Sequence, residues 1–283
     1  MEIQKNTWTT VIRPQNGRLD INLIDIWRYR DLIILFVRRD FVAVYKQTIL
    51  GPLWFLLQPL LSTLVFVIVF GFIAKIPTDG LPQILFYLSG IVIWQYFASC
   101  LVKTSDTFVA NAGMFGKVYF PRLIVPISIV LTNLLTLGIQ LCLFIIFWIS
   151  YYARGANIHL TAWIFTIPFL VLQMAALGLG LGILISSMTT KYRDLNFIVG
   201  FGVQLWMYAT PIVYPMSQIP AAWQGIYSLN PMAAIVEIFR LAFLGTGSVQ
   251  PWQWGISICV TVIVLLVGIM LFSRIEKTFM DTV

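Results

Sequence analysis

The chain has 283 residues, of which 59% are hydrophobic and 10% are charged, and its mean hydropathy is +0.89. A soluble domain carries about 25% charged residues, so this composition excludes an ordinary soluble protein. The net charge of +7 does not indicate nucleic-acid binding, because most basic residues flank apolar stretches, where anionic lipid head groups attract them.

Two N-terminal segments precede the first long apolar stretch. Residues 1–22 are polar and predict a loose cytoplasmic arm. Residues 23–50 predict an amphipathic helix, because their apolar side chains fall in one stripe about 120° wide. A basic amphipathic helix beside a membrane span is typical of a helix on the membrane surface. The alternative is a helix packed against the protein's own domain.

Residues 51–283 contain six apolar stretches, each long enough to cross a bilayer, which takes about 20 residues. They are residues 53–74, 83–102, 123–150, 161–188, 195–214 and 253–273. The predicted fold is therefore an all-α polytopic membrane protein with six transmembrane helices, preceded by the N-terminal interface helix.

The basic residues predict the orientation of these spans. With a cytoplasmic N-terminus, all of the 18 Lys and Arg residues except Lys75, Arg154 and Arg240 lie on the cytoplasmic side. Cytoplasmic connections carry an excess of Lys and Arg, so both termini are expected in the cytoplasm.

Two features inside or between the spans predict local structure. Gly178, Gly182 and Ser186 recur at intervals of four, a spacing that lets helices approach closely. The cytoplasmic connection at 103–122 predicts a short capped helix at about 104–115 that ends at glycine.

The external segment at 217–244 predicts two short re-entrant helices between the fifth and sixth spans. Asn230-Pro231 is a helix start and Gly245 a helix stop. The helix between them is about 20 Å long, too short to cross. Glu237 and Arg240 are three residues apart and can pair. Such a pair either holds the hairpin together or contacts a substrate.

Aromatic residues are abundant in and near the predicted spans. Those that we single out are Trp94, Tyr96, Phe97, Trp206, Tyr208 and Tyr214. Aromatic faces can contact sugar rings along a glycan pathway. The alternative is ordinary packing and anchoring at the membrane interface.

The sequence lacks the residue patterns that common catalytic and metal-binding sites require. No phosphate-binding loop of the Gly-x-x-x-x-Gly-Lys-Ser/Thr type occurs. The three cysteines and the single His159 form no metal-binding pattern, so we expect no metal and no catalytic residue. The simplest interpretation is a membrane pathway whose energy comes from a partner.

Several motifs resemble the permease subunit of ABC-type polysaccharide exporters, most closely the O-antigen exporters. They are Arg38-Arg39-Asp40, Tyr45 to Trp54 with Gln58-Pro59, Lys191-Tyr192-Arg193-Asp194-Leu195, Thr210 to Pro215, and Asn230-Pro231-Met232. The resemblance covers about residues 25–275. It implies a homodimer in the bacterial inner membrane with two copies of a separate ATPase subunit, which binds ATP and Mg. It also implies an undecaprenyl-diphosphate-linked polysaccharide as substrate.

The resemblance also implies roles for particular residues. Coupling to the ATPase falls to Arg38, Arg39, Thr104, Asp106, Thr107 and Phe108, and the cytoplasmic gate for the lipid diphosphate to Lys191, Tyr192, Arg193 and Asp194. An external re-entrant gate would include Asn230, Pro231, Glu237 and Arg240. Two alternatives stay open: an ABC permease for a small lipid or drug, and a membrane enzyme acting on lipid-linked sugars.

Overall fold

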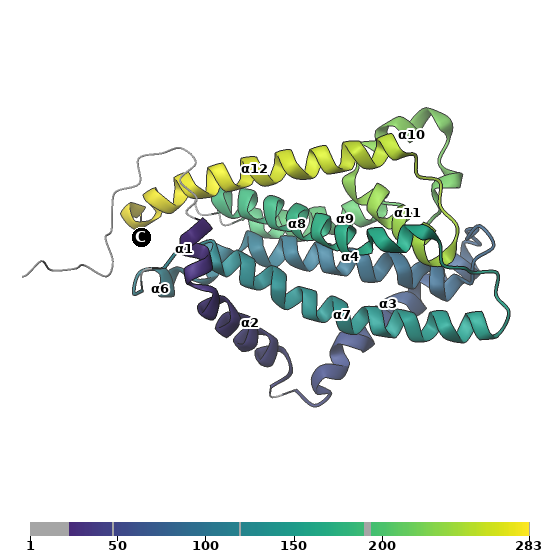
Figure 1. Cartoon of the computed structure of the whole chain (residues 1–283), viewed down its shortest axis with the longest axis horizontal. Helices are drawn as coiled ribbons and strands as arrows, with labels where there is room; N and C mark the ends of the chain where they lie inside the picture. The colour runs from purple at the N-terminus through teal and green to yellow at the C-terminus, as the bar shows by residue number, and fades with distance from the viewer. Residues whose placement is uncertain (1–22, 47, 119, 190–193, 283) are drawn as a thin grey trace, which may run out of the picture.

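The computed structural model describes residues 23–46, 48–118, 120–189 and 194–282. All regular elements among these residues are helices, which confirms the predicted all-α class. Figure 1 shows an elongated bundle in which α4, α7, α8 and α12 run along the long axis. Helices α1 and α6 and the last turns of α12 lie at one end, and α10 lies at the other.

Five helical stretches of the described residues are long and apolar enough to cross a membrane. They are Gly51–Ile73, which comprises η1 (Gly51–Leu53), α3 (Trp54–Phe66) and η2 (Val67–Ile73); α4 (Gln83–Ser105); α7 (Ile124–Ala153); η3 (Ala162–Thr166) with α8 (Ile167–Thr189); and Pro251–Ile275 of α12 (Pro251–Thr282). These stretches match five of the six predicted spans.

The remaining predicted span, 195–214, is shorter in the structure. Helix α9 covers Leu195–Tyr208 and is about 21 Å long, less than the hydrocarbon thickness. The chain leaves the helix at Ala209, two residues before Pro211. A residue that precedes proline is driven away from helical geometry, which explains the early end.

The segment that we predict to be external forms α10 (Ala221–Ser228) and α11 (Pro231–Leu244), joined at an angle of 95°. Asn230 caps α11 by accepting a hydrogen bond from the Met232 amide, and Gly245 ends it in the left-handed conformation. The predicted start and stop are thus confirmed. The depth of the two helices in the membrane stays a prediction.

Helix α4 is the centre of the bundle. It packs against α3, α7, α8, α9 and α11, and most of its residues are buried. A helix that is apolar all round needs neighbours on every side, and here other helices supply them. The neighbouring helices therefore take their positions from α4.

Close helix contacts in this core depend on glycine. A Cβ atom on Gly178 would lie 2.8 Å from the Cβ atom of Cys100, and one on Gly180 would lie 2.8 Å from the Cα atom of Leu265. The Ser186 hydroxyl accepts a hydrogen bond from the Phe108 amide. The close packing predicted for this stripe is confirmed, and it joins α8 to α4 on one side and to α12 on the other.

The N-terminal helices α1 (Leu23–Arg28) and α2 (Arg30–Tyr45) divide the predicted apolar stripe in two. Ile33 and Phe36 are buried in a cluster beside α7, whereas Trp27 is 73% exposed and Ile34 is 64% exposed. One edge of the stripe therefore packs on the protein's own domain. The other edge is free to contact lipid, and its placement at the membrane surface stays a prediction.

Replacing Gly180 with alanine should destabilise the bundle, because the new methyl group meets the backbone of α12, which cannot move aside as a side chain can. We expect a loss of about 1–3 kcal/mol, visible as a lower midpoint of thermal unfolding of the purified protein. Gly138→Ala is the matched control, since open space surrounds that position in α7. Equal midpoints for the two variants would contradict the packing described.

Candidate functional site

Arg240 lies at the centre of a buried polar network at the end of the bundle that carries α10. Its guanidinium is fully inside the protein and lies 3.8 Å from the centre of the Phe86 ring. Its N–H groups donate to the carbonyl oxygens of Pro211 (2.6 Å), Ile212 (2.9 Å) and Phe86 (3.4 Å), to the Ser89 hydroxyl (3.4 Å) and to the Glu237 carboxylate (3.3 Å). The predicted pair of Glu237 and Arg240 is thus present.

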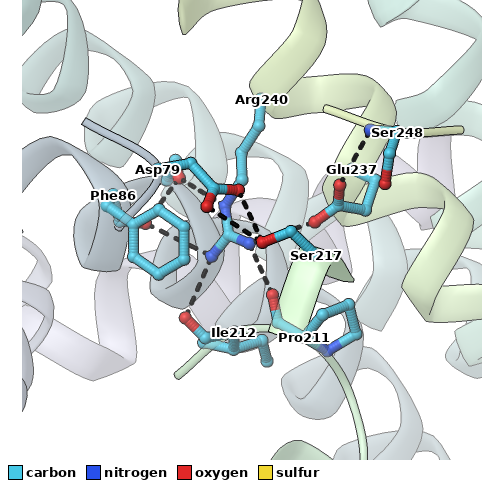
Figure 2. A network of polar contacts seen from close by, with 9 residues as sticks. Asp79, Phe86, Pro211, Ile212, Ser217, Glu237, Arg240 and Ser248 are labelled. Atoms are coloured by element: carbon cyan, nitrogen blue, oxygen red, sulfur yellow. Dashed lines mark hydrogen bonds and ion pairs between the residues drawn. The ribbon is translucent and has the colours of Figure 1, made fainter. Parts of the chain in front are cut away.

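The network extends from Arg240 into two loops, as Figure 2 shows. The second carboxylate oxygen of Glu237 accepts a hydrogen bond from the Ser248 amide at 3.3 Å. Beside the guanidinium, the Ser217 hydroxyl donates to Asp79 at 2.9 Å. With the contacts of Arg240, these hydrogen bonds connect the loop between η2 and α4, the segment after α9 and the loop after α11. The contacts of Glu237 and Arg240 themselves are those expected of a pair that holds these segments together.

Asn230 joins the end of α9 to the start of α11. Its side-chain oxygen accepts hydrogen bonds from the Met232 amide and the Trp206 indole, both at 3.1 Å. Its side-chain nitrogen donates to the Ala209 carbonyl and the Thr210 hydroxyl. The Asn-Pro motif therefore caps one helix and fastens it to another, and Pro231 is buried at the first turn.

The predicted aromatic residues fall into two groups. Trp94, Phe97 and Trp206 form one cluster, with ring centres 5.2–6.1 Å apart, and Phe97 is fully buried. Tyr96 is buried too. Within one subunit, most of these aromatic side chains therefore pack in the core, as the alternative to a glycan pathway expects. Tyr208 is 44% exposed, and Tyr214 donates to the Tyr208 carbonyl and shares a hydrogen bond with Tyr227.

A groove of about 350 Å³ runs between α3, α4 and α9. Trp94 and Tyr208 line it, together with three polar side chains that our sequence analysis did not single out: Ser62, Gln95 and Gln204. A single polar residue in an apolar stretch is a weak sequence signal for a binding site. These three residues stand out only because the structure brings them together in one groove. The groove offers one indole face, one phenol and two carboxamides, which suits a neutral polyhydroxylated ligand.

The connection between α4 and α7, which we predict to be cytoplasmic, differs in structure from its prediction. Instead of one helix over 104–115, the structure has two single turns, α5 (Thr107–Ala110) and α6 (Ala112–Phe115), because the Asn111 side chain donates to the Thr107 carbonyl and the chain bends there. Thr104, Thr107 and Phe108 are buried, and Phe108 stacks on Phe272 at 4.6 Å. Asp106 lies between α4 and α5.

The side chains of this connection that are exposed to a partner are therefore different from those to which we assigned the coupling. They include Val109, Ala110, Lys117 and Val118. A partner that docks here touches these residues, whereas Thr104, Thr107 and Phe108 hold the loop against α8 and α12.

Helix α2 presents its basic residues outward. Arg38 and Arg39 are exposed and border a shallow groove along the helix, with Arg39 paired to Asp40 at 2.7 Å. Of the predicted cytoplasmic gate, Asp194 is exposed at the start of α9, and Lys191, Tyr192 and Arg193 lie outside the described residues.

Comparison with known proteins gives consistent matches over most of the chain. The family model described as ABC-2 type transporter matches residues 31–244. An O-antigen export system permease protein from Klebsiella pneumoniae is 27% identical over 252 residues, covering 89% of this chain and 94% of that protein. A protein of the same name from Myxococcus xanthus is 28% identical, covering 77% of this chain and 82% of that protein. A capsule polysaccharide export inner-membrane protein from Neisseria meningitidis is 25% identical, covering 84% and 89%.

Replacing Arg240 with methionine should be strongly destabilising, because Glu237 and two backbone carbonyls lose their donor inside the protein. Breaking a buried pair costs about 3–5 kcal/mol. Thermal unfolding of purified protein measures the loss, and the exposed Arg154→Met is the control. Adding Glu237→Gln to the Arg240→Met variant should recover part of it, since the unpaired carboxylate is removed. Additive losses would count against coupling of the pair.

Proposed function

Because this chain belongs to the ABC-2 type transporter family, we propose that it is the channel-forming permease of an ATP-driven exporter that moves lipid-linked polysaccharide of the O-antigen type across the inner membrane. The observation that carries the proposal beyond the family is the groove between α3, α4 and α9. Aromatic faces can contact the C–H face of a sugar ring, and the carboxamides of Gln95 and Gln204 can hydrogen-bond its hydroxyls without any charge. Relatives that export O-antigen and capsule polysaccharide match most of the chain and support the same cargo class.

A homodimer would complete this groove. The outward faces of α3 and α9 are apolar and exposed in the single chain. They include Leu61, Leu64 and Val65 of α3 and Phe197, Ile198, Phe201 and Leu205 of α9. A second copy across these faces would bring two grooves together and enclose a path between them. Closed symmetry with one self-complementary surface is the commonest arrangement for such subunits.

The energy for transport would come from two copies of a separate ATPase subunit. The sequence holds no phosphate-binding loop, so ATP and Mg belong to that partner and this chain is a transport subunit rather than an enzyme. Arg38 and Arg39 on α2 and the exposed Val109 and Ala110 are the surfaces that we assign to it. Thr104, Asp106, Thr107 and Phe108 would carry the coupling inward to α4 and α8.

The ends of the pathway would serve different tasks. At the cytoplasmic end, Lys191 and Arg193 would attract the undecaprenyl diphosphate, with Tyr192 and Asp194 beside them. At the external end, α10 and α11 would form the gate, held by Asn230, Pro231, Glu237 and Arg240. Both termini would be cytoplasmic, as the basic residues indicate.

Affinity purification of the chain from native membranes, followed by mass spectrometry, tests the partner. We expect a nucleotide-binding subunit in equal amount, because the chain has no energy source of its own. An intact, folded chain that purifies alone would contradict the exporter. Deleting the gene then tests the cargo: surface polysaccharide should be lost, and unchanged polysaccharide would instead favour a small lipid or drug.

Replacing Tyr208 with alanine should lower export about threefold to tenfold, because the groove loses an aromatic contact worth roughly 0.5–1.5 kcal/mol. Surface polysaccharide is the readout, and copurification of the ATPase subunit should not change. Tyr152→Ala is the matched control, since that residue is exposed on α7 outside the groove. Tyr208 is preferable to Trp94 as a probe because truncating the buried indole would leave a cavity. Equal export in both variants would remove Tyr208 from the pathway.

A further inference from the structure

Pro59 leaves one buried carbonyl of α3 without its usual hydrogen-bond donor. It lies inside the helix and has no backbone N–H group, so it cannot donate to the carbonyl oxygen of Phe55, four residues earlier. Phe55 is buried. A buried carbonyl without a donor costs free energy, so this position of α3 needs a donor from elsewhere in the protein.

Gln140 of α7 supplies that donor. Its side chain is buried, and the side-chain nitrogen donates to the Phe55 carbonyl at 3.3 Å. The same nitrogen donates to the side-chain oxygen of Gln95, on α4, at 3.1 Å. Gln95 lines the groove between α3, α4 and α9, whereas Gln140 does not. Gln140 can therefore affect a ligand in the groove through Gln95.

These two contacts fix the direction of both carboxamides. A backbone carbonyl can only accept, so the Gln140 atom that faces Phe55 must be the nitrogen. An amide nitrogen can only donate, so the Gln95 atom that faces Gln140 must be the oxygen. Turning either carboxamide over would set two acceptors or two donors against each other. The orientation of Gln95 thus follows from the N–H group that Pro59 lacks.

The nitrogen is the part of the Gln95 carboxamide that remains for a ligand. With the oxygen held by Gln140, the two N–H groups point away from α7. They make no hydrogen bond within the described part of the chain, and they are not among its buried unpaired groups. The second carboxamide of the groove, Gln204, is exposed on α9 and has no such partner among the described residues. The groove therefore combines one oriented carboxamide with one that can turn.

We propose that Gln95 is a fixed hydrogen-bond donor in the glycan groove and that Gln140 is its positioning residue. The Gln95 N–H groups would donate to an acceptor oxygen of the sugar, a hydroxyl or an acetamido carbonyl, while Gln204 can turn to donate or accept. A side chain already held in its binding orientation loses less conformational entropy when the ligand arrives. This inference rests on the proposed function, because it gives a direction to one contact of the same groove.

Export of surface polysaccharide, divided by the amount of permease in the membrane, measures the role of both glutamines. Gln95→Met removes the donor and should lower export about threefold to tenfold. Gln140→Met releases the Gln95 carboxamide and should lower export roughly threefold. The double variant should export no less than Gln95→Met alone, because Gln140 acts through Gln95.

Asn133→Leu is the matched control for these variants. It removes another buried amide of α7, whose contacts are with Lys103 and with the Ile129 carbonyl of its own helix. Asn133 does not line the groove, so export per permease should stay the same.

A second background separates positioning from stability. Gln140→Met should lower the midpoint of thermal unfolding, because the Phe55 carbonyl loses its donor. Pro59→Ala restores the backbone N–H group, so in that background the same substitution should cost less stability. It should still lower export roughly threefold relative to Pro59→Ala alone, because Gln95 remains unheld. This background also supplies a folded protein for the comparison if Gln140→Met alone fails to fold.

Two results would overturn the inference. Export that recovers together with stability in the Pro59→Ala background would show that Gln140 only satisfies the Phe55 carbonyl. Normal export by Gln95→Met would show that no donor is needed at this position. If Tyr208→Ala still lowers export in the same assay, the groove stands and only the assignment of the glutamines falls. Failure of the proposed function looks different: the natural chain itself then exports no polysaccharide, and the assignment of the glutamines falls with it.

Discussion

A guanidinium enclosed by apolar helices is stable only if each of its N–H groups finds an acceptor, because no water is available to replace one. Arg240 meets this requirement with three backbone carbonyls, one hydroxyl and one carboxylate. The carbonyls belong to α4 and to the turn after α9, and the carboxylate to α11 itself. One side chain therefore fixes three segments that are far apart in the sequence.

The rest of this end of the bundle depends on the position that Arg240 gives to the turn after α9. The turn at Pro211 and Ile212 stays close to α4, and a Cβ atom on Gly90 would lie only 2.9 Å from the Ile212 side chain. Asn230 then ties the end of α9 to the start of α11 from the other side. Arg240 and Asn230 thus hold both ends of the segment between α9 and α11. Any movement of one of these helices would therefore have to include the other.

The structural features that could be predicted from the sequence are those that depend on the length of apolar stretches, on helix caps and on residues near each other in the chain. The five long spans, the Asn230 cap and the Glu237–Arg240 pair belong to this class. Features made by distant segments were not predictable: nothing local to Tyr96, Lys103 or Gln140 indicates that they share a cavity. The same limit hid the burial of Phe108, whose partners come from α8 and α12.

Gln95 lines both the groove between α3, α4 and α9 and a smaller cavity between α2, α3, α4 and α7. Its side-chain oxygen is held by Gln140 of α7, so the α4 side of each cavity is fixed. Gln140 also holds the start of α3, because it donates to the Phe55 carbonyl, which Pro59 leaves without its usual donor in the helix. Beyond Pro59 no such contact is made by Gln140, and residues 67–73 are wound as a π-helix. Helices yield at such breaks. The residues of α3 that line the smaller cavity come before Pro59, whereas those that line the groove come after it. Bending at Pro59 would therefore change the width of the groove while the start of α3 stays in place.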